Sequence, residues 1–279
     1  RIAASGKRVV YQSMENAYPI GTDLALVETF YDRGLRMIGP VHFRDSQFAD
    51  SATDLSANDY GGLSPLGEDL VKEANRLGMI LDGSHAADST VDDMIALSTT
   101  PLILSHTGVK DVYDHPRNID DALMRKIADD GGVIQINAYG GYLEPLEPTA
   151  QRQAALDALQ TEFDGISPLT ADDETRERYF ARMEEVDAAY PAPQSTFEKF
   201  IEHLLHALEV VGPDHVGMGA DWDGGGGVKG MEDVSFLPKV TERLLAEGYT
   251  EAEIQQFWSG NMLRLMEQAE KAKQGASVE

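Results

Sequence analysis

Residues 79–106 read MILDGSHAADSTVDDMIALSTTPLILSH, and this stretch decides the predicted fold. An apolar run at 79–85 ends in His85, residues 89–97 have the periodicity of an amphipathic helix, and a second apolar run at 101–106 ends in His106. Apolar strands that flank a helix in this way are typical of a parallel sheet covered on both faces. The stretch therefore predicts a strand–helix–strand unit in which each strand ends in a histidine.

The same alternation continues along the chain in both directions. Further strands are predicted at 9–15, 37–42, 132–137 and 215–221, and further helices at 22–33, 66–77, 120–129 and 234–246. Two α/β architectures fit this pattern, a closed (β/α)8 barrel of the TIM type and an open doubly wound sheet. No glycine-rich phosphate-binding loop follows the first predicted strand, which weakens the dinucleotide-binding form of the open sheet.

Residues 144–193 break the alternation. They have no strand pattern, hold an acidic cluster at 172–174, and end in a proline-containing segment at 190–193. We predict that residues 1–279 form a single domain with a helical, solvated insertion over 144–193, since one barrel takes about 250 residues. A charged outer surface is the favoured interpretation of the insertion, and no motif supports a role as a lid.

The composition limits the partners and the metal ligands. The formal net charge is −25 and the isoelectric point is about 4.5, so nucleic acids and anionic membrane surfaces are poor partners. The chain has no cysteine, which excludes disulfides and thiolate metal sites and leaves His, Asp and Glu as ligands. No apolar run in the sequence is long enough to span a bilayer.

The first residue is Arg1 rather than Met, and the first predicted strand follows almost at once. We interpret this as a chain whose start has been removed. The compartment stays open between periplasm and cytoplasm, and export is favoured because a cleaved signal peptide would leave such a start.

The polar ends of the predicted strands indicate a metal site. In parallel α/β folds, active-site groups collect at the carboxyl ends of the strands. Three of the seven histidines stand there with two carboxylates and an amide, namely Glu15, His42, His85, His106, Asn137 and Asp221. A single histidine in such a place is more often a hydrogen-bonded core residue, but this combination favours a site for zinc-like ions, in which a carboxylate can also bridge two ions.

Several motifs occur in an order and spacing that resemble one family. They are LDGSH at 81–85, LSH at 104–106, DHPRN at 114–118 and VGMGADWDG at 216–224, with FADS at 48–51 and GNMLR at 260–264. The set resembles the signatures of the membrane (renal) dipeptidase family of zinc metallopeptidases, and the resemblance covers essentially the whole chain. It implies an amidohydrolase-like (β/α)8 barrel and zinc-dependent hydrolysis of dipeptides by a metal-activated hydroxide.

The resemblance implies a role for each matching residue. Glu15 matches the carboxylate that bridges two zinc ions, and His85 and His106 match the ligands of the second zinc. His42 matches a histidine that contacts the substrate carbonyl and the developing oxyanion. Asp221 matches the acid that carries a proton to the leaving amine.

Two further residues are matched to the substrate. Arg117 corresponds to the arginine that holds the substrate's terminal carboxylate, which suits its planar guanidinium, and Tyr139 falls where the family has a tyrosine lining the substrate site. From the residues alone, Arg117 could instead cap a helix or pair with Asp120 or Asp121. Asp223 is interpreted as bracing the glycine turn at 224–227, and the other histidines, at 115, 203, 206 and 215, are interpreted as structural.

The sequence departs from the family pattern in two places. The family's first strand ends in His-x-Asp, which supplies ligands to the first zinc, and no His-x-Asp occurs in this sequence. About six strand–helix units are predicted where a closed barrel needs eight, so we expect a barrel that lacks the first one or two β/α units, where His-x-Asp would stand. Residues 13–17 read SMENA where the family has glycines, which puts the local backbone in question and not the carboxylate.

Other functions stay open beside a dipeptidase. An amidohydrolase acting on a non-standard amide or a peptide-derived metabolite would use the same metal site. A non-catalytic accessory protein with a degenerate metal site would fit the missing His-x-Asp. An open-sheet binding module without metal is disfavoured by the three strand-end histidines. A dipeptide is the expected small-molecule partner, and the resemblance suggests a homodimer.

Overall fold

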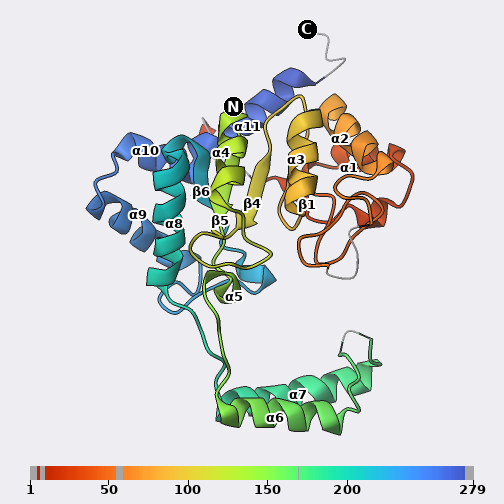
Figure 1. Ribbon diagram of the computed structural model, residues 1–279, viewed down its shortest axis with the longest axis vertical. Coiled ribbons are helices and arrows are strands. Elements are labelled where there is room, and N and C mark those ends of the chain that lie inside the picture. Colours follow the sequence, from red (N-terminus) through yellow and green to blue (C-terminus); the bar gives the residue numbers. More distant parts are fainter. Residues whose placement is uncertain (1–4, 7–9, 55–58, 169, 274–279) are drawn as a thin grey trace.

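Six short parallel strands form the centre of the computed structural model, which describes residues 5–6, 10–54, 59–168 and 170–273 (Figure 1). One sheet holds β1 (Gln12–Met14), β2 (Leu35–Ile38) and β3 (Ile80–Leu81), and a second holds β4 (Ile103–Thr107), β5 (Val133–Ile136) and β6 (Val216–Met218). A parallel bridge between Asp82 and Ile103 joins β3 to β4. The strands therefore neighbour one another in chain order.

This strand order is that of a barrel wall rather than of a doubly wound sheet. A doubly wound sheet reverses its order at a switch point, whereas consecutive parallel neighbours joined by helices place the helices on one face. Among the described residues, however, no pairing joins β6 to β1, so the structure shows an open arc of mixed α/β structure, and barrel closure is not shown. The described residues form six strands, whereas the barrel predicted from the sequence takes eight strands to close.

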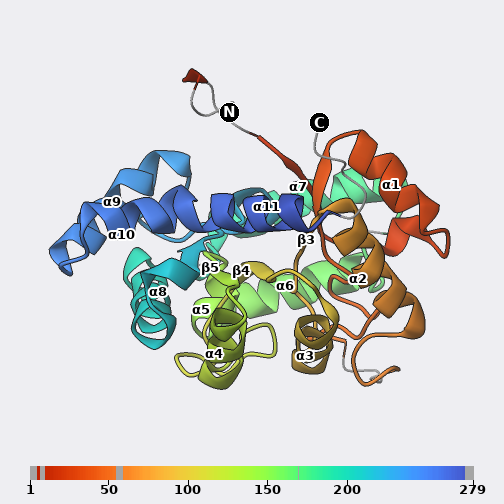
Figure 2. The ribbon, with the colours of Figure 1, turned by 90° about the horizontal axis from the view of Figure 1, so that it is seen from above.

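Helices cover the outer face of the arc. They are α1 (Ala25–Asp32), α2 (Pro65–Leu77), α3 (Asp88–Leu97), α4 (Asp121–Asp129) and α8 (Phe197–Val211), seen from two sides in Figure 1 and Figure 2. Ser64 begins α2 by accepting a hydrogen bond from the backbone N–H of Gly67. Gly78 ends α2 with a φ of 73°, a left-handed conformation that favours glycine. The helix predicted to begin at 22 begins at Ala25.

The strands are shorter than predicted, and several predicted strand-end residues stand in the loops that follow. Gly39 ends β2 where the chain passes Glu15, and a Cβ at this glycine would lie 2.6 Å from the carbonyl oxygen of Glu15. His85 and Asp221 have φ values of 68° and 59°, which turn the chain out of its extended course. The apolar pattern cannot reveal these two turns, because neither residue is a glycine.

The two faces of the strand arc are covered differently. The larger hydrophobic core lies between the strands and the outer helices. On the other face, α11 (Asn261–Ala272) lies across the strands (Figure 2), and its Leu265 and Ala269 pack on Met37, Ile80, Ile103 and Val133. Since β3, β4 and β5 begin at the last three of these residues, α11 covers the amino ends of the strands and leaves their carboxyl ends for the site.

The C-terminal motif around Asn261 is a structural anchor. α9 (Leu237–Ala246) leads to α10 (Glu251–Gln255), where the predicted capping box of Thr250 and Glu253 is confirmed, and a π-helical turn at Gln256–Gly260 leads on to α11. The Asn261 side chain donates to the carbonyl oxygens of Pro213 and Val216. These bonds tie the start of α11 to the start of β6.

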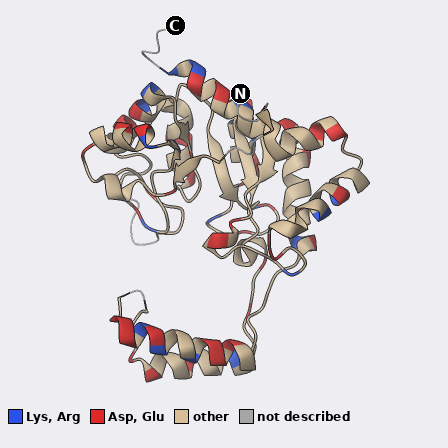
Figure 3. Cartoon of the chain, turned by 180° about the vertical axis from the view of Figure 1, so that it is seen from behind, with Lys and Arg blue, Asp and Glu red and all other residues tan. Residues whose placement is uncertain are grey.

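Residues 144–193, predicted to be helical, contain α6 (Ala150–Glu162) and α7 (Asp173–Ala189), which follow the short α5 (Gly140–Leu143). Figure 1 shows this helical pair projecting from the body on two extended connections. The connections are held together where Ser195 donates to Glu144, with Oγ and Oε1 2.6 Å apart. Charged residues lie mostly on these and the other helices, while the strands carry few (Figure 3). No helix within the described ranges is long and apolar enough to cross a membrane.

Candidate metal centre

Glu15, His85 and His106 form a compact cluster of possible metal ligands. The Oε1 atom of Glu15 lies 3.1 Å from Nε2 of His85 and 3.2 Å from Nε2 of His106, and the two Nε2 atoms are 3.0 Å apart. One ligand atom from each residue lies within 4.8 Å of the others. The two imidazole side chains are buried, whereas the Glu15 side chain is 47% exposed. The cluster therefore opens to solvent on the side of the carboxylate.

The sheet brings these residues together from distant parts of the sequence. Glu15 follows β1 directly, His106 lies in β4, and His85 stands in the left-handed turn beyond β3. Because the strands are parallel, their carboxyl ends meet at one edge, where active-site groups collect in such folds. The structure thus places three of the predicted strand-end residues in mutual contact.

The protonation states suit a divalent cation. The neighbouring imidazoles of His106 and His85 hold the pKa of the Glu15 carboxyl well below its usual range. Burial lowers the pKa of His85 to about 4, which leaves its imidazole neutral at physiological pH. An ionised carboxylate and neutral imidazoles are the forms in which these side chains bind metal ions. The donor set accordingly fits one zinc-like ion, and the described residues offer no second such group.

His42 lies at the open side of the cluster. Its Nε2 atom is 3.8 Å from Oε1 of Glu15, and its ring centroid is 4.3 Å from that of His85. Burial lowers the pKa of His42, so a neutral imidazole that can donate or accept a hydrogen bond faces the cluster.

Arg117 is a buried cation without a carboxylate partner. Its side chain forms no ion pair within the described residues, and its Nη2 donates to the carbonyl oxygen of His106 at 2.8 Å. The Nε atom has no hydrogen-bond partner among the described residues. Burial lowers the pKa of Arg117 to about 10, which still leaves it charged at neutral pH. The alternatives in which Arg117 caps a helix or pairs with Asp120 or Asp121 are wrong.

Those two carboxylates have other partners. Asp120 caps α4 by accepting from the backbone N–H of Leu123, and Asp121 binds Arg125 and His206. Arg117 is therefore held beside the metal cluster by burial and by the carbonyl of His106, and its Nε has no hydrogen-bond partner among the described residues.

Asp221 faces the same group of charges from the turn that follows β6. Burial raises the pKa of its half-buried carboxyl, the negative charge of Glu15 raises it further, and the positive charge of Arg117 lowers it. Its carbonyl oxygen accepts hydrogen bonds from the backbone of Gly224 and Gly226, at 3.1 and 2.7 Å. The backbone of Asp221, rather than Asp223, thus organises the glycine turn.

Tyr139 lies at the rim of the site, and within the part of the chain that the structure describes it forms no hydrogen bond or ring contact with the metal cluster. It is 37% exposed, and a Cβ at Gly225 would lie 3.2 Å from its ring, so the glycine turn passes directly over it. Tyr142, which the sequence did not single out, stacks on Tyr139 with ring centroids 4.5 Å apart and lies 5.7 Å from the guanidinium of Arg117. The two tyrosines line the side of the site that Arg117 occupies.

Sequence reasoning also missed Asp82, Ser84 and Ser105, which connect to His106 by hydrogen bonds. They stand within the LDGSH and LSH motifs, next to the predicted ligands. Their place in the motifs is the only sequence signal for them, because the contacts join two different strands.

The remaining histidines have structural partners, as predicted. His203 accepts from the backbone of Val109 at Nδ1, and its Nε2 lies 2.9 Å from the carbonyl oxygen of Leu143. His206 pairs with Asp121, and Nδ1 of His215 lies 2.9 Å from the carbonyl oxygen of Gly132. Nδ1 of His115 accepts from the backbone of Arg117.

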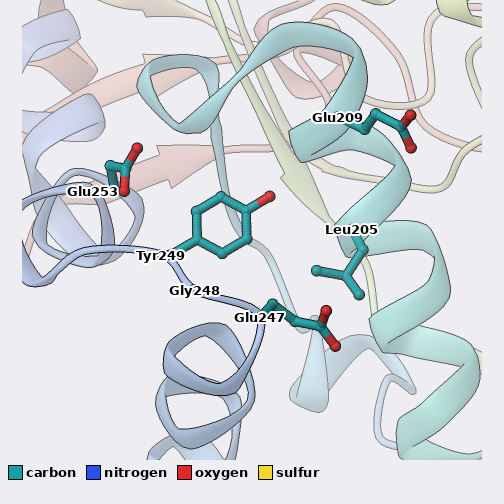
Figure 4. Close-up of a pocket in the computed structure, with 6 residues that line it drawn as sticks. All are labelled: Leu205, Glu209, Glu247, Gly248, Tyr249 and Glu253. Carbon is teal, nitrogen blue, oxygen red and sulfur yellow. The ribbon is translucent and has the colours of Figure 1, made fainter.

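A separate hollow of about 440 Å³ lies between α8 and the α9–α10 connection (Figure 4). Its carboxylates include Glu247, which pairs with Arg243, and Glu253, which completes the capping box of Thr250. It shares no residue with the metal cluster, so the hollow is no part of this site.

Comparison with solved structures supports both the fold and the family. The probable dipeptidase PvdM from Pseudomonas aeruginosa is 33% identical with a TM-score of 0.80, over 98% of this chain and 72% of that chain. A metallopeptidase from Rhodobacter sphaeroides, solved with a phosphinate mimic of the dipeptide L-Ala-D-Ala, is 28% identical with a TM-score of 0.70, over 93% of this chain and 63% of that chain.

Curated relatives are longer than this chain. An uncharacterized dipeptidase of Schizosaccharomyces pombe is 30% identical over 92% of this chain and 52% of its own length, and dipeptidase 3 of Mus musculus is 29% identical over 94% and 44%. The chain thus spans about half the length of the curated relatives it matches. The family model for membrane dipeptidase (peptidase family M19) matches residues 1–279, and the chain belongs to this family of metallopeptidases.

Proposed function

We propose that the protein hydrolyses dipeptides with a divalent metal ion, zinc by preference, held by Glu15, His85 and His106. One observation carries the proposal: a buried guanidinium without a carboxylate partner lies beside three ligand atoms that fit a metal ion. Such a pair recognises a substrate that carries a free carboxylate close to a hydrolysable carbonyl. A dipeptide has both groups: the scissile carbonyl belongs to its first residue and the free carboxylate to its second.

The metal ion would supply Lewis-acid chemistry, polarising the peptide carbonyl and lowering the pKa of a water molecule. Glu15, His85 and His106 would hold it in the protonation states described above. The family resemblance implies a second zinc with ligands from His-x-Asp, which this sequence does not contain; of the described residues, the partly exposed Glu15 carboxylate would be available to such an ion.

Arg117 would bind the terminal carboxylate of the dipeptide. Its free donors suit a bidentate contact with a planar carboxylate, and its burial strengthens the charge–charge attraction because water screens it little. Tyr139 and Tyr142 would line the adjoining pocket. A substrate without a free terminal carboxylate would leave the guanidinium buried and unpaired.

His42 and Asp221 would handle charge and protons at the scissile bond. His42, neutral at the open side of the cluster, would donate a hydrogen bond to the carbonyl oxygen as negative charge develops there. Asp221 would accept a proton from the attacking water and pass it to the leaving nitrogen, and its raised pKa brings it closer to the range useful for this transfer.

The test is the turnover of free dipeptides by the zinc-loaded protein, measured as the release of amino acids. Glu15→Gln and His85→Gln should abolish both zinc binding and turnover, because each removes one of three ligands. His215→Gln, on a histidine bound only to the Gly132 carbonyl, is the matched control and should retain both. Turnover that persists in the metal-free protein would overturn the proposal.

A non-catalytic accessory protein is the second candidate. It is favoured by the missing His-x-Asp and by a donor group that fits a single ion within the described residues. Zinc binding without hydrolysis of any dipeptide or N-acylated amino acid would support it. Hydrolysis of N-acylated amino acids alone would instead support an amidohydrolase on a non-standard amide.

Sedimentation of the same sample tests the homodimer that the resemblance suggests.

A further inference from the structure

Asp82 is a buried carboxylate that follows β3, and among the described residues its side chain accepts hydrogen bonds from Ser84 and Ser105. Its Oδ1 accepts from the backbone N–H groups of Ser84 and Ser105, at 2.9 and 3.0 Å. Its Oδ2 lies 2.5 Å from the hydroxyl oxygen of Ser105. An ionised carboxylate can only accept hydrogen bonds, so the single hydroxyl proton of Ser105 points at Asp82.

The direction of every other bond in this network follows from that proton. The Oγ atom of Ser105 also lies 2.9 Å from Nδ1 of His106 and 3.2 Å from Oγ of Ser84. Because the Ser105 proton is engaged, Ser105 accepts in both contacts, and Nδ1 of His106 must carry a hydrogen. Ser84 has a compatible role, since its Oγ accepts from the backbone N–H of His106 at 3.1 Å and its own proton is free for Ser105.

We infer that Asp82 and Ser105 are positioning residues that fix the tautomer of His106 and present its Nε2 lone pair to the metal ion. A neutral imidazole with hydrogen on Nδ1 has its lone pair on Nε2, the atom that faces Glu15 and His85. Carboxylates behind metal-bound histidines commonly act in this way, and here a hydroxyl stands between them. The inference rests on the proposed metal site.

His85 offers a contrast within the same cluster. Its buried Nδ1 has no hydrogen-bond partner among the described residues, so no such network fixes its tautomer. The hydrogen-bond relay from Asp82 through Ser105 therefore fixes the tautomer of His106 and not that of His85.

Asp82→Asn provides a directional test. The two backbone N–H groups at Oδ1 hold the side-chain oxygen of an asparagine in that place, which turns its NH2 group toward Ser105. Ser105 must then accept from this NH2 group and donate to Nδ1 of His106. The substitution should move the His106 hydrogen from Nδ1 to Nε2, the atom that the metal needs. Ser105→Ala should leave neither tautomer enforced, and Ser105→Thr should keep the relay.

Two measurements on the full chain read this out without substrate. Long-range ¹H–¹⁵N spectra of the metal-free protein at pH 8, with His106 assigned by a His106→Gln variant, should show hydrogen on Nδ1 in the parent and on Nε2 in Asp82→Asn. Zinc affinity, measured by competition with a chelator, should fall about 10- to 100-fold in Ser105→Ala and further in Asp82→Asn. Ser105→Thr should restore parental affinity.

Ser98→Ala is the matched control, because Ser98 donates to the carbonyl of Thr100 and touches no histidine. It should change neither the tautomer nor the zinc affinity. An unchanged His106 tautomer in Asp82→Asn, or parental zinc affinity in a folded Ser105→Ala, would overturn the relay. If the tautomers and zinc affinities are as expected but the zinc-loaded parent protein does not hydrolyse dipeptides, the proposed function alone is overturned.

Discussion

At the scale of single residues, the backbone of the site departs from the regular conformations of its strands. Of the three non-glycine residues with positive φ in the described ranges, His85 and Asp221 belong to the candidate site, and the third, Asp164, lies between α6 and α7. Such conformations cost roughly 1–3 kcal/mol each and persist where the surroundings impose them. At His85 the turn aims the imidazole at Glu15 and His106.

Arg117→Ala should mainly weaken the binding of substrates with a free terminal carboxylate. Losing a charge-assisted bidentate contact costs about 2–4 kcal/mol, or roughly 30- to 1000-fold in kcat/KM. Steady-state kinetics on free and amidated dipeptides separates this effect from general damage, since amidated dipeptides should be poor substrates that change little. Arg125→Ala, on an exposed arginine of α4, is the control. Equal losses on both substrate types would remove Arg117 from the carboxylate role.

Asp221→Asn should abolish most turnover while the metal stays bound. Removing a positioned general base typically lowers the rate about 10²- to 10⁴-fold. Asparagine tolerates the left-handed backbone at this position, so the melting temperature should change little. The measurement is kcat with zinc content on the same sample, and Asp223→Asn on the exposed neighbour is the control. Near-normal kcat would rule out proton transfer by Asp221, and zinc loss would make it chiefly a ligand.

At the scale of elements, helix α8 joins the chain around the site through one buried histidine. His203 accepts from the backbone of Val109, in the loop after β4, and contacts the carbonyl of Leu143 at the end of α5. Both bonds require a neutral ring with its hydrogen on Nε2. The imidazole thus connects three elements that carry or flank site residues.

This geometry predicts a dependence of stability on pH. Burial lowers the pKa of His203 below its ordinary value of 6.5, so the unfolded chain binds more protons there than the folded one. The contribution of His203 to the free energy of unfolding is therefore present above about pH 6.5 and is lost as the pH falls toward its lowered folded pKa. When the free energy of unfolding is measured by urea unfolding at several pH values between 5 and 8, it should rise less steeply with pH in His203→Gln than in the parent.

Other buried histidines contribute the slope that remains in this variant, because burial also lowers the pKa values of His85, His42 and His115. At pH 8, His203→Gln should cost about 1–3 kcal/mol from the unsatisfied N–H of Val109. An identical slope in parent and variant would show that His203 does not titrate differently in the folded protein.

At the scale of the whole molecule, the open arc of strands and the single ligand cluster predict how metal affects the chain. One zinc ion per chain should bind tightly, because the described residues bring together ligand atoms for only one such group. Zinc at 100 times its Kd should add about 2.7 kcal/mol to the free energy of unfolding and raise the Tm by several degrees.

Elemental analysis and thermal unfolding with and without a chelator check both values. His106→Gln should lose the zinc-dependent rise in Tm, whereas His206→Gln, on the outer helix α8, should keep it. Two tightly bound zinc ions per chain would contradict this ligand assignment.

The sequence by itself determined the alternation of strands and helices, the identity of the ligand-bearing strand ends and the family. Apolar periodicity depends on local packing needs, so it predicted α2, α3 and α4 nearly to the residue. Short motifs can likewise be recognised in the sequence alone, because each consists of consecutive residues. They are the motifs around His85, His106, Arg117 and Asp221.

Only the tertiary structure decided which of these groups touch and in what state. The contact of Glu15 with His85 and His106, the unpaired guanidinium of Arg117 and the bond from Ser105 to Asp82 each join separate strands or loops. Sequence spacing carries no distance between strands, and burial, which sets the pKa of His85 and Asp221, depends on neighbours supplied by other elements. The open edges of β1 and β6 are likewise a tertiary property, because within the described residues no hydrogen-bond pairing joins these two strands.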